Sequence, residues 1–384
     1  MLAEKNIQQT VPQYKQSSYQ IVEFPSFADR LVQWQLAHGR HSLPWQGTRD
    51  PYVIWISEVM LQQTQVNTVI PYFERFMATF PNVAALAAAS VEAVLALWSG
   101  LGYYSRGRNL HRTACILQTQ YDGKFPKDAA SLQQLPGIGR STAAAIAVFA
   151  VGERVAILDG NVKRILARYF GIGTYPSEKK TEQHLWELAE DLLPSTQDHQ
   201  VLTAYTQGLM DLGALVCTRA QPHCQRCPLQ VDCKAYRDNL TATLPAAKPK
   251  KILPTKEVAH LILLNQGHVL LTKRPTSGIW GGLWCFPEVT VDQNGIDYCA
   301  ENLCLQVERQ TELAPLNHTF THFKLTIYPQ ILRLISHQSS WKKSDRENNY
   351  LWVGIEEALT CAIPAPVRKL LLAVQPVLRT FMHE

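Results

Sequence analysis

The sequence predicts a mostly α-helical domain followed by an α+β domain. From Phe27 to about Tyr236 the apolar residues follow a helical pattern, with no convincing pair of strands before residue 240. A Lys-rich segment punctuated by prolines, 246–256, then has the composition of a linker. After it, two β-prone runs flank a turn-like Asn-Gln-Gly, which is typical of a hairpin.

Individual elements support this division. Asp50-Pro51 supplies an N-cap and a first-turn proline, and the apolar stretches 51–77 and 83–98 are expected to be helical. The strands of the hairpin are expected at 260–264 and 268–272, with a further strand at 325–334 and a closing helix at 366–377. We therefore predict an arm (1–25), a helical domain (26–236), a linker (237–256) and an α+β domain (257–384), with no internal repeat.

Composition excludes several classes of protein. With 46% hydrophobic residues and a net charge of +5, the 384-residue chain is neither disordered nor collagenous. The longest apolar run near the middle, 143–151, is far shorter than the roughly 20 residues of a membrane span. The first residues resemble neither a secretory signal nor an Arg-rich transit peptide, so we expect a cytoplasmic protein with no membrane partner.

Positive charge is concentrated between residues 100 and 170, where ten bases and four acids give +6. Such a region can hold a polyanion. It can equally be a solvated basic face, and charge alone does not decide between them.

Four of the nine cysteines lie within seventeen residues, in the pattern Cys217-x6-Cys224-x2-Cys227-x5-Cys233. In a reducing compartment such clustering indicates metal ligation before disulfides. Four thiolates can surround one zinc ion or the corners of an iron–sulfur cubane, and the spacing does not choose between these. Free buried thiols are the remaining alternative.

A glycine-rich segment precedes an alanine-rich helix in Leu135-Pro-Gly137-Ile-Gly139-Arg-Ser141. A Gly-x-Gly helix start exposes backbone N–H groups and the positive end of the helix dipole, which suits a phosphate. The segment follows a helix rather than a strand, so it is not a dinucleotide-binding or P-loop motif. A plain turn remains the alternative.

Two carboxylates stand in apolar surroundings, Glu58 in Ile-Ser-Glu-Val-Met-Leu and Asp159 in Ile-Leu-Asp-Gly-Asn-Val. Burial raises the pKa of a carboxyl group unless something compensates. Each is therefore a satisfied structural group, such as a helix cap by Asp159, or a tuned acid or base. Paired carboxylates are also the usual means of cleaving a glycosidic bond.

Taken together, these motifs resemble the helix-hairpin-helix DNA glycosylases of the endonuclease III-like superfamily, over nearly the whole chain from about Trp34. The matching segments are Leu43-Pro-Trp45, Ser57-Glu-Val-Met-Leu-Gln-Gln-Thr-Gln-Val66, Gly100-Leu-Gly-Tyr-Tyr104, the hairpin at 135–143, Leu158-Asp-Gly-Asn-Val-Lys-Arg164 and the cysteine loop. The details resemble the branch of this family that removes adenine paired with 8-oxoguanine or guanine in double-stranded DNA.

The resemblance implies a 4Fe-4S cluster on the four cysteines, with Glu58 protonating the extruded adenine and Asp159 stabilising the sugar cation. It implies that wedge residues fill the gap left by the base. It also assigns DNA or substrate contacts to Trp45, Gln62, Gln63, Thr64, Leu101, Tyr103, Gly137, Gly139, Ser141, Asn161 and Gln207. Of these, Trp45 and Gln207 match the adenine pocket, Leu101 and Thr64 the 8-oxoguanine side, and Gln62, Gln63 and Tyr103 the wedge.

Ser141 bears on the type of reaction. Relatives that also cut the backbone have a lysine at this position, whose amine attacks the sugar. A hydroxyl cannot form an imine, so we expect a monofunctional enzyme that leaves an abasic site.

The second domain resembles the family's 8-oxoguanine-reading module, which is similar in fold to Nudix hydrolases. The Nudix carboxylate box is missing after Phe286-Pro-Glu288, and Glu301 alone cannot replace it, so we expect binding rather than hydrolysis. Phe320-Thr321-His322 matches the family's recognition loop, where serine is commoner in the middle. Thr321 keeps the hydroxyl and adds a methyl group.

Three alternative functions fit the sequence less well. A thymine-glycol-type lyase would lack the second domain and require lysine at 141. A non-catalytic iron–sulfur DNA-binding protein would not need both Glu58 and Asp159. A Nudix hydrolase with a helical appendage would require the metal box, which this sequence lacks. We expect the enzyme to act as a monomer.

Overall fold

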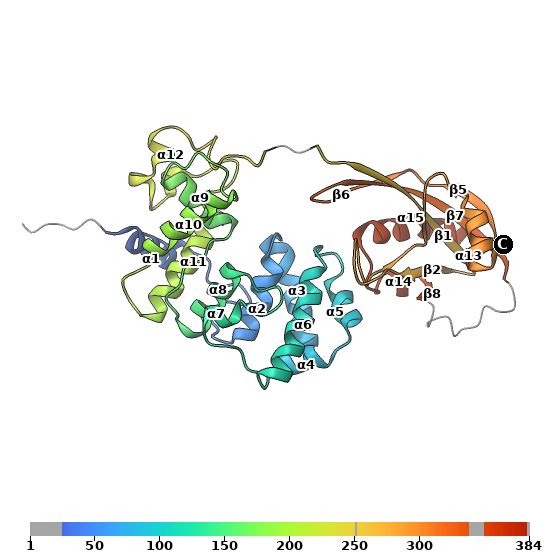
Figure 1. Ribbon diagram of the computed structural model, residues 1–384, viewed down its shortest axis with the longest axis horizontal. Coiled ribbons are helices and arrows are strands. Elements are labelled where there is room, and N and C mark those ends of the chain that lie inside the picture. Colours follow the sequence, from blue (N-terminus) through green and yellow to red (C-terminus); the bar gives the residue numbers. More distant parts are fainter. Residues whose placement is uncertain (1–24, 250–251, 338–348, 382–384) are drawn as a thin grey trace, which may run out of the picture.

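The computed structural model describes residues 25–249, 252–337 and 349–381. Apart from Pro25, the predicted N-terminal arm lies outside the described residues. Figure 1 shows a helical part and a sheet-containing part side by side. In the described residues, no helix is both apolar enough and long enough to cross a membrane.

The helical part forms two lobes, each around its own core. One core lies among α2 (Pro51–Leu61), α3 (Val66–Thr79), α4 (Val83–Ala88), α5 (Val91–Trp98), α6 (Ser105–Gln120), α7 (Ala129–Leu132) and α8 (Arg140–Val151). The other lies among α1 (Phe27–His38), α9 (Gly160–Tyr169), α10 (Lys179–Asp191) and α11 (His199–Leu215), with one side of α8. The cysteine loop, with η1 (Cys224–Arg226), η2 (Gln230–Asp232) and α12 (Lys234–Arg237), packs on this second lobe.

Both apolar stretches predicted to be helical are interrupted. In the first, α2 ends at Leu61 and α3 begins at Val66, because Gln63 has a left-handed backbone with φ 58°. In the second, Ser90 begins a new helix by accepting a hydrogen bond from the backbone N–H of Ala93 at 3.1 Å. Local capping thus overrides the helix propensity of the alanine run.

The second part confirms the predicted α+β class. Its strands are β1 (Thr255–Asn265), β2 (His268–Lys273), β3 (Trp284–Cys285), β4 (Glu288–Val289), β5 (Leu305–Glu312), β6 (Leu316–Thr319), β7 (Lys324–His337) and β8 (Tyr350–Gly354). They form one mixed sheet in the order β3-β2-β1-β7-β5, in which β4 pairs with β1, β6 with β7 and β8 with β2. The predicted hairpin is present, since Asn265 pairs with His268, and β1 runs parallel to β7. The predicted linker end, 255–256, is already part of β1.

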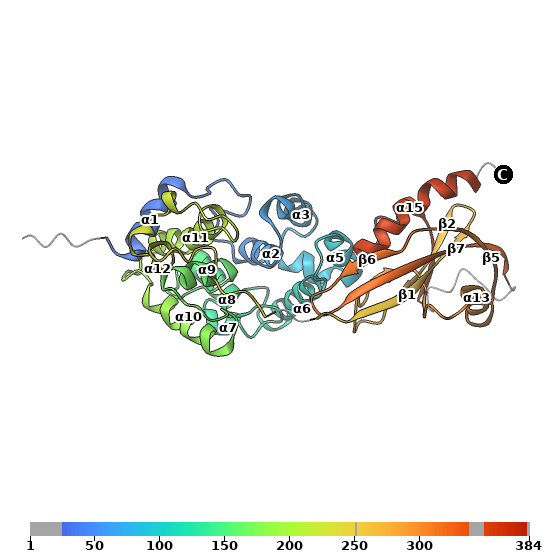
Figure 2. The same ribbon diagram turned by 90° about the horizontal axis from the view of Figure 1, so that it is seen from above.

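Helices cover both faces of this sheet. Along β1, Ile262 and Leu264 face α15 (Ala365–Phe381), whereas Leu261 and Leu263 face α13 (Gly295–Leu303). This alternation follows from the period of two in a strand. Figure 2 shows α15 and α13 on opposite sides of the strands, and a short α14 (Ile355–Ala358) follows β8.

The two parts are joined by a built interface. The hydroxyls of Ser99 and Tyr104 both donate to the carbonyl oxygen of Ile363, each at 2.9 Å. Arg108 donates to the carbonyl oxygen of Gly281 at 2.8 Å, and Lys273 pairs with Glu92. One apolar core continues across the junction. The α+β part is therefore fixed against α5 and α6.

Candidate active site

A cleft of about 1470 Å³ separates the two lobes of the helical part. One wall comes from α2 and the segments next to it, and the other from the start of α9 and from α11. Nine of the residues singled out from the sequence line this cleft: Trp45, Glu58, Gln62, Gln63, Thr64, Ser141, Asp159, Asn161 and Gln207.

Glu58 enters the cleft from the apolar helix α2, whose other side is buried in the lobe core. Its surroundings raise the pKa of the carboxyl group from 4.5 to about 8. Desolvation by burial is the larger cause, and the nearby charge of Asp159 adds to it. At neutral pH Glu58 is therefore mainly protonated and can donate a proton.

Asp159 is the N-cap of α9, as the sequence allowed. Its Oδ1 accepts hydrogen bonds from the backbone N–H groups of Asn161 and Val162, each at 2.9 Å. Burial raises the pKa of this carboxyl group, while these hydrogen bonds and the charge of Arg164 oppose the rise. The cap also fixes where the carboxylate lies, so the structural and the catalytic interpretation are compatible.

The glycine hairpin leads directly into this site. Gly137 has φ 80°, and a Cβ there would lie 2.7 Å from Cβ of Asn109, so the turn requires glycine. Gly139 is the N-cap of α8, as predicted for a helix start. Ser141, in the first turn of α8, accepts a hydrogen bond from the backbone N–H of Leu158 at 3.0 Å. The helix that follows the hairpin, α8, thus holds Leu158, the residue before Asp159.

On the wall that α11 contributes, Gln207 is held by a buried ion pair. Its Nε2 donates to Oδ1 of Asp211 at 2.9 Å, and Asp211 is bound by Arg40 through the side chain at 2.7 Å and the backbone N–H at 2.8 Å. An ionised carboxylate only accepts hydrogen bonds, so it fixes which end of the amide points to it. The carbonyl oxygen of Gln207 therefore remains as an acceptor for a ligand.

Four predicted DNA contacts of the helical part do not line the cleft: Leu101, Tyr103, Gly137 and Gly139. Leu101 is buried, whereas the Tyr103 side chain is 47% exposed and has φ 47°. The loop that carries both is tied to residues 62–64 by the guanidinium of Arg106.

The four cysteines line a separate cavity next to α9 and α11. Within the described ranges, no three His, Cys, Asp or Glu side chains are arranged to hold a metal ion. Burial raises the pKa of the Cys227 thiol to about 12, so a cationic centre is needed to keep it as a thiolate. Arg164 connects this loop to the cleft, since it donates to the carbonyl oxygen of Cys217 at 2.7 Å and to Oδ1 of Asn161 at 2.8 Å.

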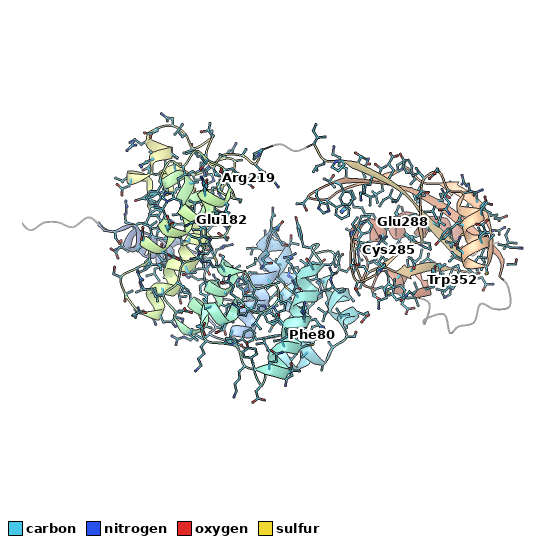
Figure 3. The ribbon with its side chains drawn as sticks, in the orientation of Figure 1. Phe80, Glu182, Arg219, Cys285, Glu288 and Trp352 are labelled. Carbon is cyan, nitrogen blue, oxygen red and sulfur yellow. The ribbon has the colours of Figure 1, made fainter. Side chains whose placement is uncertain are left out.

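The predicted recognition loop lies between β6 and β7, away from this cleft. Phe320 stacks on Phe323 with ring centroids 4.5 Å apart and an interplanar angle of 20°. Thr321 and His322 are exposed next to it. In Figure 3, Arg219 at the cleft and Glu182 lie in the helical part, whereas Cys285 and Glu288 lie in the sheet-containing part that carries this loop.

Sequence reasoning missed two residues of the site. Asp211 is fully buried in the apolar helix α11, and the same criterion that singled out Glu58 could have found it. The sequence marks Arg106 only as one of the ten bases between residues 100 and 170. It and Arg168 are buried, and both donate to backbone carbonyls, so these two charges belong to the interior and not to a basic face.

The two-lobed helical fold and the hairpin next to a carboxylate cleft define a base-excision DNA repair protein of the helix-hairpin-helix class. Residues 56–191 match the family described as HhH-GPD superfamily base excision DNA repair protein, and residues 258–373 match the NUDIX domain. A solved thermostable thymine-DNA glycosylase is similar, with a TM-score of 0.50 and 29% identity over 55% of this chain and 95% of that one.

More specifically, the chain belongs to the adenine DNA glycosylase family and is therefore a hydrolase of N-glycosidic bonds. It is 37% identical to the adenine DNA glycosylase of Buchnera aphidicola subsp. Schizaphis graminum, over 90% of this chain and 97% of the relative. It is 33% identical to the human adenine DNA glycosylase, over 96% of this chain and 78% of the relative.

Proposed function

We propose that this enzyme removes adenine paired with 8-oxoguanine, or with guanine, from double-stranded DNA and leaves an abasic site. The relatives named as adenine DNA glycosylases support adenine as the leaving base. The observation that carries the proposal is the pair formed by Glu58 and Asp159 in one cleft, with the pKa of Glu58 at about 8.

In this proposal the two carboxyl groups have different tasks. Glu58, protonated at neutral pH, donates its proton to a ring nitrogen of adenine, so that the base departs as a neutral molecule. Asp159 stabilises the positive charge that develops on the sugar, and water then completes the hydrolysis. The backbone N–H groups that bind Asp159 keep its carboxylate directed at one place and favour its anionic form.

The reaction is proposed to be monofunctional because of Ser141. Its hydroxyl is engaged with the backbone of Leu158 and offers no amine for attack on the sugar. The product would therefore be an abasic site in an intact strand.

A base must leave the stack to reach this cleft. We propose that Trp45 and Gln207 line its pocket and that Gln62, Gln63 and Tyr103 fill the gap in the duplex. The helix start at Gly137 and Gly139 would hold a backbone phosphate, with Ser141 and Asn161 next to the sugar. Leu101 and Thr64 would lie against the opposite base.

The four-cysteine loop is proposed to hold a 4Fe-4S cluster. All four soft ligands surround one cavity, which suits a group larger than a single ion. Around a zinc ion at about 2.3 Å the sulfur atoms would have to converge on one point. Bound there, the cluster would crosslink the loop and keep its basic residues, such as Arg226, in place.

The α+β domain (257–384) is proposed to bind 8-oxoguanine through Phe320, Thr321 and His322 and not to hydrolyse nucleotides. The half-buried Phe320 ring, supported by Phe323, and the exposed Thr321 hydroxyl offer stacking and hydrogen bonding to a base. The interface with α5 and α6 would keep this loop at a fixed position relative to the catalytic domain.

A single-turnover assay tests the proposal. One duplex carries adenine opposite 8-oxoguanine and a control carries adenine opposite thymine, and each sample is read with and without alkali. We expect strand breaks only in the mispaired duplex and only after alkali. Breaks without alkali would point to a lyase, and intact DNA from an iron-loaded sample would refute glycosylase activity on this pair.

A further inference from the structure

Arg106, in the first turn of α6, is buried beneath two loops that come from different parts of the chain. Its Nη1 donates to the carbonyl oxygens of Val59, Met60 and Gln62 at 2.8, 2.9 and 2.6 Å. Its Nη2 contacts the hydroxyl of Thr64 and the carbonyl oxygens of Leu101 and Gly102 at 3.3, 3.3 and 3.2 Å. One planar side chain therefore connects the end of α2, the loop after it and the loop before α6.

Both loops carry a non-glycine residue in a left-handed backbone conformation. These residues are Gln63, with φ 58°, and Tyr103, with φ 47°. Such conformations are costly and persist only where the surrounding structure determines them fully. Arg106 supplies that constraint, because it binds residues on both sides of Gln63 and the two residues before Tyr103, and its guanidinium lies 5.6 Å from the Tyr103 ring centroid.

Burying a charged guanidinium at this position costs free energy. Within the described ranges, its partners are carbonyl oxygens, one hydroxyl and the rings of Trp98 and Tyr103, and none is a carboxylate. Among the residues that the structure describes, its Nε has no hydrogen-bond partner. Desolvation lowers its pKa to about 10, so it stays charged at neutral pH. Burying a cation without a carboxylate partner is unfavourable, so its five carbonyl contacts have to compensate for the lost hydration.

We propose that Arg106 is a positioning residue for base extrusion, which holds the two loops so that Gln63 and Tyr103 enter the duplex together. The inference rests on the proposed function, in which these residues fill the space left by the adenine. Arginine is suited to the task because its rigid fork reaches both loops at once, whereas the ammonium of lysine is a single point.

The test separates extrusion from chemistry. In a Glu58→Gln background, which cannot protonate the base, 2-aminopurine replaces the target adenine and its fluorescence reports unstacking. At saturating protein, we expect Arg106→Lys to reduce the fluorescence gain at least about threefold. With Glu58 intact, we expect Arg106→Lys to lower the single-turnover rate by about tenfold to a hundredfold. That deficit should shrink when the neighbouring pairs are mismatched, because unstacking then costs less.

Arg154→Lys is the matched control. Its guanidinium also donates to two backbone carbonyls, those of Pro194 at 2.7 Å and Leu193 at 3.3 Å, but it contacts neither loop. Arg154→Lys should change neither the fluorescence gain nor the ratio of the single-turnover rates on the duplexes with matched and with mismatched neighbouring pairs. An unchanged fluorescence gain in Arg106→Lys, or an equal loss of rate on both duplexes, would overturn the proposal. If the wild-type enzyme released no adenine from the mispaired duplex, that result would instead refute the proposed function.

If Arg106→Lys shows no cooperative thermal unfolding, hydrogen exchange in the wild-type enzyme decides. The backbone N–H groups of Thr64 and Leu101 each donate to the carbonyl oxygen of the last residue of the preceding helix, Leu61 of α2 at 3.2 Å and Trp98 of α5 at 3.1 Å. Loops held by one guanidinium should open together, so these two amides should have protection factors within about tenfold of each other. A larger difference would show that the loops move independently and would refute the proposal.

Discussion

The raised pKa of Glu58 determines how the rate of base release should change with pH. With a pKa of about 8, the carboxyl group is about 90% protonated at pH 7 and about 9% protonated at pH 9. If the protonated form is the active one, the second-order rate constant should fall about tenfold over these two pH units. With the ordinary value of 4.5, the same carboxyl would already be about 0.3% protonated at pH 7.

The assay measures adenine release under single-turnover conditions at limiting protein, because that rate constant reports the pKa of the free enzyme. Binding of the Glu58→Gln variant to the same duplex, measured at each pH, shows whether affinity contributes to the change. A rate that stays constant from pH 7 to pH 9, with unchanged affinity, would refute the assignment of Glu58 as the acid.

A direct titration separates the two causes of the shift. In Asp159→Asn the neighbouring charge is absent, so the pKa of Glu58 should fall, yet it should stay well above 4.5 because burial is the larger cause. Carbon NMR of the Glu58 carboxyl group follows this without any need for activity. A return to the ordinary value would show that the charge of Asp159, and not burial, dominates.

Four further predictions concern single side chains. The folded protein keeps the Glu58 proton up to about pH 8 while the unfolded chain releases it near 4.5, so stability from this group is complete below pH 4.5 and is lost as the pH rises to 8. At pH 7 the free energy of unfolding has fallen by about 3 kcal/mol for this reason. Glu58→Gln should therefore unfold at a higher temperature than wild type at pH 7 but not at pH 4.5. Equal shifts of the unfolding temperature at both pH values would contradict this. Asp159→Asn should keep the helix cap and unfold at no lower a temperature than wild type, because the amide avoids burying a charge. Its rate should fall about a hundredfold or more, and a fully active Asn variant would argue against a role for the charge of Asp159. Asp159→Ala also removes the cap, so it should be about 1 kcal/mol less stable than the Asn variant. Asp211→Asn should allow the Gln207 amide to turn and so reduce the preference for adenine over hypoxanthine about tenfold, measured as a ratio of rates; an unchanged ratio would show that Asp211 does not set the orientation. Cys227→Ser should remove the visible absorption of an iron–sulfur cluster and lower the iron content, and a variant with unchanged iron would exclude this residue as a ligand.

Local chemistry explains why several parts of the fold could be predicted from the sequence. The Asp50-Pro51 start of α2, the Asp159 cap of α9 and the hairpin of β1 and β2 each depend on residues adjacent in the chain. The breaks at Gln63 and Ser90 were missed because a strong apolar or alanine-rich composition conceals a single capping or left-handed residue.

The candidate site shows the same division. Glu58, Asp159 and the cysteine loop were identifiable because a carboxylate in an apolar run, or four closely spaced thiols, is unusual in itself. Arg106 was hidden in a charge count, since its importance comes from carbonyl groups on two loops that only the folded chain brings together. The apolar run around Asp211 could have singled it out as it did Glu58, but its role comes from its contacts with Gln207 and with Arg40, 171 residues away.

The sequence alone determined the two fold classes, the order of the elements and the residue types available for chemistry, because propensities, caps and ligand spacing are local properties. The tertiary structure alone decided which of those residues share a cleft and what their protonation states are. Glu58 is mainly protonated at neutral pH because packing removes water from it and brings Asp159 to its side. Desolvation and charge–charge interactions depend on distances in space, and the order of residues along the chain does not specify those distances.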